Sequence, residues 1–416
     1  MKVLLVAPNI DGTDVGEAFV AFKWAEALGR RVDLTVLTFQ RAGRKAVADQ
    51  LPGVEVVTFP EPAWLGRFER FNAMAKPAWP LFCRNVRRFV REASARGERF
   101  DLAHQLMPNA ARYASPLNRC GIPYVVGPVG GGLSTPDAFR AECGTARWYT
   151  RARALDSLRL ARDPWLRRSF MEAELVLGVA PYVRDHLRRV PPRRFEAMLE
   201  IGVDAIAPPR ARERRPGMLR LLHVGRAVRT KGLRDAVRAM AHLADRPGIT
   251  LTAAGAGEEV GPCREEAERL GLGERVTILG GVPRAEVERL YAAADVFLFP
   301  SFREPAGGVL LEAMRWGLPV VTVDRGGPGF IVDAACGLAV PVTDPVRMPR
   351  DLAAAVATLA DDPALLERLG EGALARVESV GLWSERAARM VELYGEIARG
   401  RALHVPARTT GHRPNG

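Results

Sequence analysis

An alternation of short apolar runs with helical patterns limits the folds that this chain can adopt. In the C-terminal half, the apolar runs predict strands at residues 221–224, 250–254, 275–279, 296–300 and 319–323. The N-terminal half repeats the alternation more loosely, with strands expected near Val3, Val32, Val54, Leu102, Tyr124 and Leu175. Strands that alternate with helices form parallel sheets with helices on both faces. The predicted fold class is therefore α/β, with doubly wound sheets.

The composition places a boundary between two domains. Residues 208–217 contain too much proline and charge for the interior of a helix or strand. We therefore expect an N-terminal domain at 1–205, a linker at 206–217 and a C-terminal domain at 218–382. A chain of 416 residues, 48% of them hydrophobic, can bury two cores of ordinary size. Residues 404–416 have the composition of a disordered tail.

Membrane spans and metal sites are not expected. No apolar run approaches the roughly 20 residues that cross a bilayer, and the first eight residues follow a strand pattern rather than that of a signal peptide. The five cysteines are scattered, without a Cys-x-x-Cys pair or a clustered histidine. These features predict a cytoplasmic protein with free thiols.

Two glutamates eight positions apart lie between the strand run 296–300 and the helical run 309–314. Glu304 falls in the expected turn, and Glu312 falls in the helix. A helix that follows such a turn has unpaired backbone N–H groups at its N-terminus, which can hold an anion or sugar hydroxyls. On this interpretation both carboxylates accept hydrogen bonds from one polyol. The alternative is that Glu304 caps the helix and Glu312 is solvated.

A second strand-loop-helix unit carries two cations. Arg226 and Lys231 lie between glycines 225 and 232, which allow a sharp turn between the strand pattern at 219–224 and the helical pattern at 233–243. They stand where a phosphate would meet a helix N-terminus. A basic loop alone is most often solvated. Together with the acidic turn, however, it indicates a ligand that contains both a phosphate and sugars.

Five motifs in order resemble one family: residues 225–232, 254–257, 276–280, 291–295 and 304–312. They resemble the retaining glycosyltransferases of family 4, the group 1 glycosyl transferases, over about residues 219–337. The resemblance implies the GT-B fold, in which two Rossmann-like domains face each other across a cleft. It also implies a last helix, here at 383–403, that crosses back to the N-terminal domain.

The resemblance further implies roles for individual residues. Arg226 and Lys231 hold the diphosphate, and Glu304 holds the hydroxyls of the transferred sugar, so these three are the expected catalytic residues. The other expected donor contacts are Glu312 for the ribose, backbone groups of Gly307, Gly308 and Val309 for the sugar and phosphate, and Gly280 and Val282 for the base.

The expected chemistry is the transfer of a sugar from a nucleotide-diphosphate sugar. The departing nucleoside diphosphate gains negative charge, so nearby cations stabilise the transition state selectively. Many glycosyltransferases of the other common architecture hold a metal with an Asp-x-Asp pair, and no such pair occurs here. We therefore expect a reaction without a metal or other cofactor. Retention of configuration is implied by the resemblance.

Two glycine-rich loops in the N-terminal half are further candidates. Gly16 falls near the second glycine of the family's usual pair, with Val15 in place of the first. The resemblance implies that this loop closes on the donor phosphates, so Gly16 is an expected donor-binding residue, and a plain strand-helix turn is the alternative. Gly130 and Gly131 belong to a Gly-Pro-x-Gly-Gly-Gly loop at 127–132 and are expected to lie near the substrate. Many relatives carry a histidine there, near the sugar, and the chain resembles the subset of the family that has this loop instead. His104 ends another expected strand and is placed facing the cleft, with a hydrogen-bonded structural role as the alternative.

Most of the net charge of +12 falls in residues 1–205. Much of it lies in residues 67–91 and 147–168, where aromatic residues are interleaved with arginines. Such helices suit an anionic membrane surface, so peripheral contact with the inner face of the membrane is one interpretation. An arginine-rich solvated face is the other. No nucleic-acid-binding motif accompanies the charge.

The sequence therefore predicts a retaining glycosyltransferase. Its acceptor would be a glycan, a lipid-linked glycan of envelope or exopolysaccharide synthesis, or a small natural product. A nucleotide-sugar epimerase of similar architecture would also need a phosphate site but has no reason to carry the turn at 304–312. A non-catalytic nucleotide-sugar binder is the remaining alternative.

Overall fold

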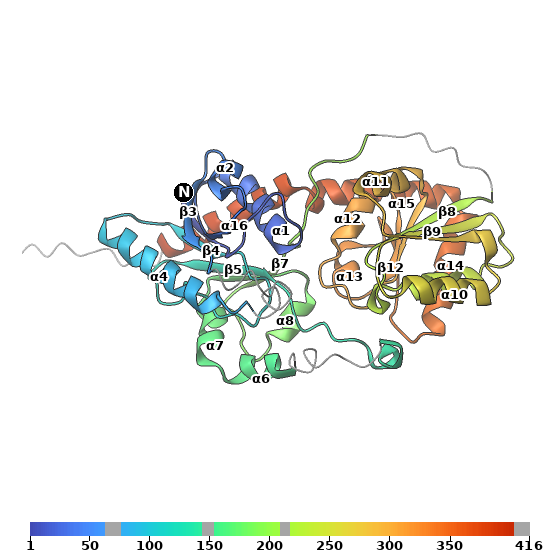
Figure 1. Ribbon diagram of the computed structural model, residues 1–416, viewed down its shortest axis with the longest axis horizontal. Helices are drawn as coiled ribbons and strands as arrows, with labels where there is room; N and C mark the ends of the chain where they lie inside the picture. Colours follow the sequence, from blue (N-terminus) through green and yellow to red (C-terminus); the bar gives the residue numbers. More distant parts are fainter. Residues whose placement is uncertain (63–75, 144–153, 209–216, 403–416) are drawn as a thin grey trace, which may run out of the picture.

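The computed structural model describes residues 1–62, 76–143, 154–208 and 217–402. They form two α/β lobes that lie side by side (Figure 1). The N-terminal lobe contains a seven-stranded sheet in the order β3-β2-β1-β4-β5-β6-β7, and every pair of neighbours is parallel. Its strands are β1 Lys2–Val6, β2 Asp33–Gln40, β3 Glu55–Pro60, β4 Leu102–Gln105, β5 Tyr124–Val129, β6 Leu175–Gly178 and β7 Phe195–Ala197.

The C-terminal lobe contains a six-stranded parallel sheet in the order β10-β9-β8-β11-β12-β13. Counted from its first strand, this is the order 3-2-1-4-5-6 of a Rossmann domain, and the first six strands of the other sheet follow the same order. Its strands are β8 Leu219–Val224, β9 Ile249–Ala254, β10 Val276–Gly280, β11 Val296–Phe299, β12 Val320–Val323 and β13 Gly337–Val340.

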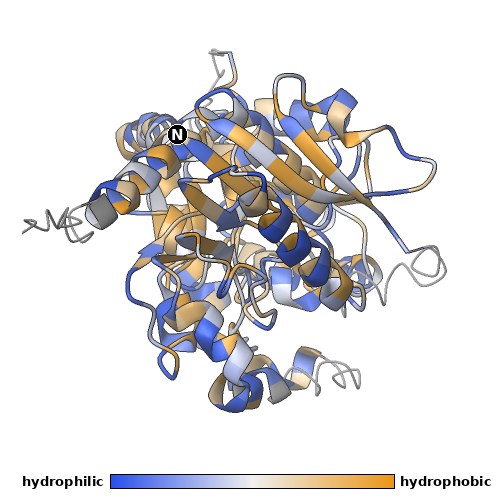
Figure 2. Ribbon diagram, turned by 90° about the vertical axis from the view of Figure 1, so that its left-hand side faces the viewer, coloured by the Kyte–Doolittle hydropathy of each residue, from blue (hydrophilic) through white to orange (hydrophobic). Residues whose placement is uncertain are grey.

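Helices cover the faces of both sheets. Figure 2 shows mostly apolar strands inside and helices that carry both apolar and polar residues around them, as expected for helices with one buried face. The N-terminal helices are α1 Glu17–Gly29, α2 Val47–Gln50, α4 Trp79–Ala95, α6 Ala154–Arg162, α7 Pro164–Met171 and α8 Tyr182–His186. The later helices are α9 Leu233–Ala241, α10 Val260–Arg269, α11 Arg284–Ala293, α12 Gly308–Met314, α13 Pro328–Ile331, α14 Arg347–Asp361, α15 Pro363–Arg376 and α16 Trp383–Ala402.

The predicted α/β architecture is confirmed, and each expected strand is present. Two strands were not predicted. Strand β7 is only three residues long and has a glutamate at its centre, so it shows no apolar run. Strand β13 is apolar, but it is only four residues long and begins with glycine. The limits of the two domains stay predictions, because most of the expected linker (residues 209–216) and the expected tail at 404–416 lie outside the described residues.

The last helix crosses between the lobes, as the resemblance implied. In Figure 1, α16 runs from the C-terminal lobe over the N-terminal lobe, where it packs against α1. The rings of Trp24 and Trp383 meet edge to face with centroids 5.7 Å apart. Met390, Leu393 and Tyr394 are fully buried in the same apolar core as strand β1.

A short segment of the N-terminal half reaches across in the other direction. This strap, defined as residues 137–143, forms two 3-10 turns and lies against the C-terminal lobe (Figure 1). Phe139 has no exposed surface, belongs to the C-terminal core, and stacks on Phe302 with ring centroids 4.3 Å apart. Two segments, α16 and the strap, therefore tie each lobe to the other.

The expected basic-aromatic helices are only partly present as surface features. Trp79 and Phe82 of α4 are buried in the N-terminal core, and Phe89 is packed against that core. Those aromatic rings therefore do not face a membrane, which corrects the interpretation of α4. Trp165 is the exception, since it is 50% exposed. Phe68, Phe71, Trp148 and Tyr149 lie outside the described residues.

Among the described helices, none combines the length and apolar character needed to cross a membrane.

Candidate active site between the lobes

The loops that leave β8, β9 and β10 pack backbone against backbone. The Ala227 N–H donates to the carbonyl of Ala256 over 2.9 Å, and the Gly255 N–H donates to that of Gly280 over 2.7 Å. A Cβ atom on Gly255 would lie 1.7 Å from the carbonyl oxygen of Gly225, so only glycine fits there. The three predicted loops therefore meet at the carboxyl ends of their strands, where ligands of doubly wound sheets bind.

Lys231 and Glu304 form an ion pair between two of the predicted motifs. Both side chains are 13% exposed. Lys231 ends a 3-10 turn, Arg229–Lys231, and the next residue, Gly232, has a φ of 81°. A Cβ atom on Gly232 would lie 2.2 Å from the carbonyl oxygen of Pro300, so this glycine lets the cationic loop approach the end of β11.

The two arginines of the cationic loop have different environments. The Arg226 side chain is exposed and has no hydrogen bond or ion pair with any described residue, although its backbone carbonyl accepts from the Val228 N–H over 2.8 Å. Arg229 is 5% exposed and pairs with the fully buried Asp235 and with Glu142 of the strap. Burial alone would lower the pKa of Arg229, but these two carboxylates raise it, so Arg229 stays charged. The Arg226 side chain is thus available to a ligand, whereas Arg229 has a structural role.

The turn before α12 is organised around Glu304. Its Oε1 accepts a hydrogen bond from the backbone N–H of Gly307, which has a φ of 83°. Glu304 therefore caps the turn with one oxygen and pairs with Lys231 through the other. Gly308 is half-buried, and a Cβ atom there would lie 2.9 Å from the side chain of Ile201 in the N-terminal half. Val309, also half-buried, completes the predicted segment.

Glu312 does not share a partner with Glu304. Its Oε2 accepts from Arg284 over 3.0 Å and from the Tyr291 hydroxyl over 3.5 Å. Glu304 therefore pairs with Lys231, whereas Glu312 pairs with Arg284 and Tyr291. Gly280 is buried with a φ of 79°, and Val282 is half-buried, at the end of the neighbouring β10.

The predicted N-terminal glycine loop lies against the Glu304 turn. Residues directly after Gly132 contact the C-terminal lobe: Arg303 donates to the Thr135 hydroxyl over 3.2 Å, and Arg325 donates to the carbonyl of Ser134 over 2.9 Å. A Cβ atom on Gly326 would meet both Leu133 and the carbonyl of Glu304. The structure therefore brings the N-terminal and C-terminal candidates together. The Gly326 segment was not predicted.

Gly130 and Gly131 lie in contact with two other elements of the N-terminal lobe. The Gly130 N–H donates to the carbonyl of Asn109 over 2.6 Å. Gly131 has a φ of 133°, and a Cβ atom there would lie 3.5 Å from Nε2 of His186 in α8. Although the loop itself contains no histidine, an imidazole from another element therefore lies against it. Burial lowers the pKa of His186.

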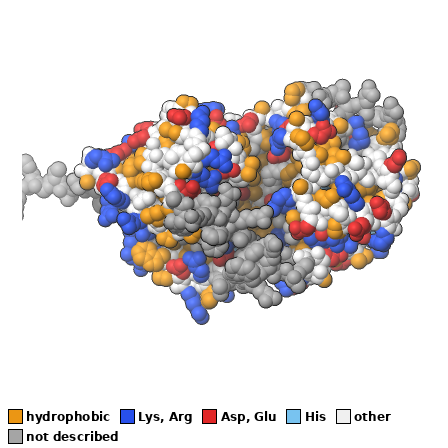
Figure 3. All heavy atoms as spheres, in the orientation of Figure 1, with side chains coloured by type: hydrophobic (Ala, Val, Ile, Leu, Met, Phe, Trp, Pro, Cys, Tyr) orange, Lys and Arg blue, Asp and Glu red, His pale blue; other side chains and the backbone are white. Residues whose placement is uncertain are grey.

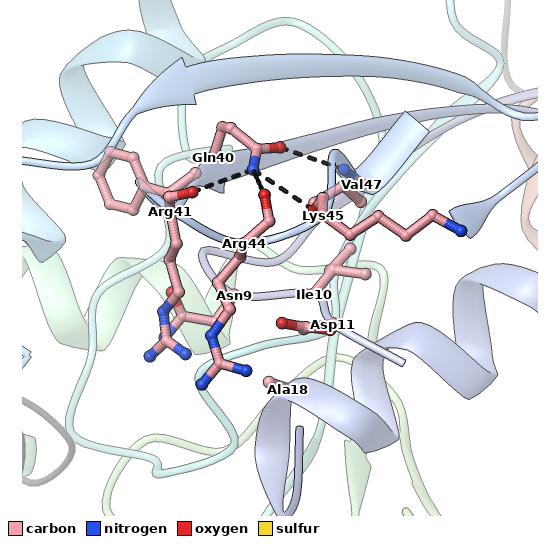
Figure 4. Close-up of a pocket in the computed structure, with 10 residues that line it drawn as sticks. Asn9, Ile10, Asp11, Ala18, Gln40, Arg41, Arg44, Lys45 and Val47 are labelled. Carbon is pink, nitrogen blue, oxygen red and sulfur yellow. Dashed lines mark hydrogen bonds between the residues drawn. The ribbon is translucent and has the colours of Figure 1, made fainter. Parts of the chain in front are cut away.

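Gly16 precedes α1 with a φ of 68° and has open space around its Cα. Beside this loop, a small pocket lies at the ends of β1 and β2 (Figure 4). The amide of Gln40 holds its rim by donating to the carbonyls of Arg41, Arg44 and Lys45 and by accepting from the Val47 N–H. Figure 4 shows the guanidinium groups of Arg41 and Arg44 extending in the same direction.

His104 is not at the cleft, which corrects the expectation from sequence. It has no exposed surface. Its Nδ1 lies 2.5 Å from the Tyr394 hydroxyl of α16, and its Nε2 lies 2.5 Å from the carbonyl of Gly127. Burial lowers its pKa to about 4, so it is neutral at pH 7. Both nitrogens are occupied, and His104 therefore anchors the crossover helix.

Three polar residues near the lobe interface were missed from sequence: Asn109, Tyr182 and Glu200. Asn109 Nδ2 donates to Glu200 Oε2 over 2.7 Å. The pKa of Glu200 is raised to about 7, mainly by burial and to a smaller extent by the carboxylates of Glu17 and Glu304, while the hydrogen bond from Asn109 opposes the shift. None of the three stands in a recognisable motif. Glu200 follows the short strand β7, where the apolar pattern gives no signal.

Two Rossmann-like lobes joined by a crossover helix define the GT-B class of glycosyltransferase fold, and here an acidic turn is paired with a cationic loop in the second lobe. A family model for a glycosyl transferase 4-like domain matches residues 16–199. A second model, for glycosyl transferases group 1, matches residues 209–376. The chain belongs to the group 1 glycosyl transferases. Its place in a subset with the Gly-Pro-x-Gly-Gly-Gly loop stays a prediction.

Curated relatives resemble part of the chain. Glycogen synthase of Mycobacterium tuberculosis is 34% identical over 211 residues, which are 49% of this chain and 49% of the relative. D-inositol 3-phosphate glycosyltransferase of Streptomyces bingchenggensis is 31% identical over 251 residues, 57% of this chain and 51% of the relative. The chain thus spans about half the length of the curated relatives it matches.

Solved structures share the fold over nearly the whole chain. Sucrose-phosphate synthase from Thermosynechococcus elongatus superposes with a TM-score of 0.60 at 19% identity, covering 96% of this chain and 99% of the other. Anabaena HepE in complex with UDP gives a TM-score of 0.63 at 18% identity, covering 95% and 100%. At these identities the likeness concerns the fold alone.

Proposed function

We propose that this protein transfers a sugar from a nucleotide-diphosphate sugar to an acceptor hydroxyl, with retention of configuration. The observation that carries the proposal is the Lys231–Glu304 pair at the meeting point of the two lobes, with the unpaired Arg226 on the same cationic loop. A cation beside a carboxylate suits a ligand whose phosphates need positive charge and whose sugar hydroxyls need an acceptor.

The chemistry assigns different tasks to these side chains. Arg226 and Lys231 would hold the diphosphate and stabilise the charge that develops as it leaves, which lowers the barrier beyond the gain from binding alone. Glu304 would then accept hydrogen bonds from the transferred sugar. Glu312 would bind the ribose hydroxyls after exchanging its contact with Arg284. Gly280 and Val282 would contact the base.

The names of similar proteins support a choice of donor and acceptor to test. Anabaena HepE has been crystallised with UDP and with UDP-glucose, which supports a uridine nucleotide as the first donor to test. The curated relatives are named for glycogen and for D-inositol 3-phosphate, so the acceptor would be a polyol of a glycan, a lipid-linked glycan or a small natural product. The epimerase alternative loses support from the family membership, and no described contact favours a non-catalytic binder.

Substitution of Glu304 tests the proposed function. Turnover is followed as release of UDP from UDP-glucose, and UDP affinity is measured by calorimetry. Glu304→Ala should lose turnover at least a hundredfold while UDP affinity changes less than threefold, because Glu304 faces the sugar rather than the diphosphate. Lys231→Ala should weaken both. Equal turnover in Glu304→Ala and the wild type would refute the assigned site.

We also propose a peripheral contact with the inner face of the membrane, where a lipid-linked acceptor would be found. The support for this contact comes from Trp165, which is 50% exposed. The guanidinium groups of Arg87 and Arg119 lie over its ring, 5.4 Å and 5.9 Å from the ring centroid. Figure 3 shows Lys and Arg side chains along the outer edge of the N-terminal lobe. An amphipathic ring flanked by cations suits an anionic lipid surface.

A further inference from the structure

Glu200 stands where the N-terminal half meets the start of α12. The Trp24 indole Nε1 donates to its carbonyl oxygen over 2.8 Å, which fixes the backbone. The next residue, Ile201, packs against Gly308. The Glu200 segment therefore contacts the helix that follows the Glu304 turn.

One oxygen of the Glu200 carboxylate accepts a hydrogen bond from Asn109, and the other oxygen has no hydrogen bond with a described residue. Oε2 accepts from Asn109, whose loop also carries the carbonyl that receives the Gly130 N–H. Within the described residues no donor reaches Oε1, and this atom is not fully buried. A carboxylate held by a single amide has further hydrogen-bonding capacity for a ligand.

Tyr182 adds a second unused group. Its hydroxyl oxygen is buried beside the backbone N–H of Gly131, and its own proton has no acceptor among the described residues. Burial and the charge of Glu200 raise its pKa, the Gly131 N–H lowers it, and Glu304 adds a smaller rise. Gly131 follows Gly130, whose N–H donates to Asn109, so Tyr182 lies against the loop that the partner of Glu200 also contacts. A buried O–H without an acceptor costs free energy, which an oxygen of a bound polyol would recover.

The charged groups around Glu200 come from three elements. Glu17 begins α1 and Glu304 precedes α12, and both raise the pKa of Glu200 after the larger effect of burial. Arg386 of α16 lowers it, but Arg386 donates to the carbonyl of Leu199 and makes no hydrogen bond to Glu200. With a pKa of about 7, the carboxyl can both lose and gain a proton under neutral conditions.

We propose that Glu200, Asn109 and Tyr182 form the subsite for the acceptor's polyol hydroxyl, with Glu200 as the group that takes its proton. This rests on the proposed function. During transfer, the bond between the anomeric carbon and the diphosphate oxygen breaks, and its electron pair leaves with the nucleoside diphosphate. The acceptor oxygen forms the new bond to the anomeric carbon, and its proton passes to the Glu200 carboxylate. Tyr182 and Asn109 position the hydroxyl and the carboxylate.

The test reads the Glu200 carboxyl directly by NMR, in full-length protein labelled with ¹³C at the glutamate side-chain carboxyl. Glu200→Gln assigns its resonance, and Glu196→Gln, on the adjacent strand, is the matched control. UDP is added first, then D-glucose or myo-inositol as the polyol probe. We expect the polyol to move the Glu200 resonance and lower its pKa, because a donated hydrogen bond stabilises the carboxylate. Glu200→Gln should weaken polyol binding at least tenfold and leave UDP affinity within twofold.

Different results separate the two proposals. UDP binding without any response of Glu200 to either polyol overturns the subsite and leaves the donor site intact. A response of Glu200 to a polyol without UDP binding supports the subsite and refutes the uridine donor. A parallel loss of UDP and polyol affinity in Glu200→Gln shows a structural role and overturns the proposal. Tyr182→Phe is a second variant, because it removes a hydroxyl whose proton has no acceptor among the described residues. It should weaken polyol binding alone.

Discussion

Arg226 and Arg229 lie three positions apart on one loop and have opposite environments. Arg229 is held by Asp235 and Glu142, and it lies over the rings of Phe139 and Phe302. A guanidinium that is buried and paired on several sides is part of the structure, because removing it leaves uncompensated buried carboxylates. Arg226, exposed and without a described partner, has no such structural task.

Alanine substitutions should separate these two arginines. Arg226→Ala should lower UDP affinity about tenfold and change the free energy of unfolding by less than about 0.5 kcal/mol. Arg229→Ala should cost about 3–5 kcal/mol of stability, since Asp235 would remain buried and unpaired. Calorimetric titration with UDP and urea unfolding measure the two effects. Unchanged UDP affinity in Arg226→Ala would exclude this residue from the donor site.

Glu200 gives a prediction for stability against pH. Its pKa is about 7 in the folded protein and 4.5 ordinarily, so between these values the folded chain keeps a proton that the unfolded chain releases. Its contribution to stability is full below pH 4.5 and is lost as the pH rises through 7. Wild type should therefore lose about 2 kcal/mol relative to Glu200→Gln between pH 5 and pH 8. Urea unfolding at both values checks this, and a constant difference between the two proteins contradicts it.

A site residue can be predicted from sequence when strand order alone fixes its position. Lys231 and Glu304 follow strands β8 and β11, which are neighbours in the sheet, so their loops have to meet. Glu200 follows a three-residue edge strand without an apolar pattern. Its environment arises from α1, α16 and the Glu304 turn, which only the tertiary fold brings together. His104 was placed at the cleft because it ends a strand, but α16 covers it.

Among the elements, the strap shows how the lobes hold each other. Phe139 contributes to the core of the opposite lobe, and Glu142 accepts from both Arg229 and Arg238. Burial alone would raise the pKa of Glu142, but the two arginines lower it, so the carboxylate stays charged at neutral pH. Residues 133–136 join the glycine loop to the strap, and Ser134 and Thr135 contact the C-terminal lobe. The strap therefore helps to set the position of Gly130 and Gly131 relative to the Glu304 turn.

Phe139→Ala should destabilise the protein by about 3–5 kcal/mol, because it opens a cavity beneath Phe302 in the C-terminal core. Phe19→Ala is the matched control, since Phe19 is 37% exposed and its loss should cost less than about 1 kcal/mol. Urea unfolding measures both. Equal stability losses in the two variants would show that the strap does not contribute to the core.

At the scale of the whole molecule, the distribution of charge does not follow the repeated fold. The two sheets have the same Rossmann order, but most of the positive charge falls in residues 1–205. The buried rings of Trp79 and Phe82 show that an aromatic residue among arginines can serve the core rather than a membrane. The sequence could not distinguish these cases, because both place aromatic residues on one face of a helix.

The membrane proposal predicts a difference between two exposed apolar side chains. Trp165→Ala should lower binding to vesicles of anionic phosphatidylglycerol at least threefold, because the amphipathic ring between the two arginines is lost while the arginines remain. Leu158→Ala, which removes a side chain that is 43% exposed on α6, should have little effect. Cosedimentation with anionic and zwitterionic vesicles measures this. Equal binding of Trp165→Ala and the wild type to anionic vesicles would refute the contact.

The proposed donor site is best tested by thermal unfolding of the purified protein with UDP-, GDP-, ADP- and dTDP-sugars, each with and without EDTA. A ligand that binds the folded chain raises its Tm by mass action. We predict a selective rise with UDP-glucose that persists in EDTA and disappears in Lys231→Ala. A Tm unchanged by every nucleotide sugar, or a rise that EDTA abolishes, would contradict a metal-independent site built on Lys231 and Glu304.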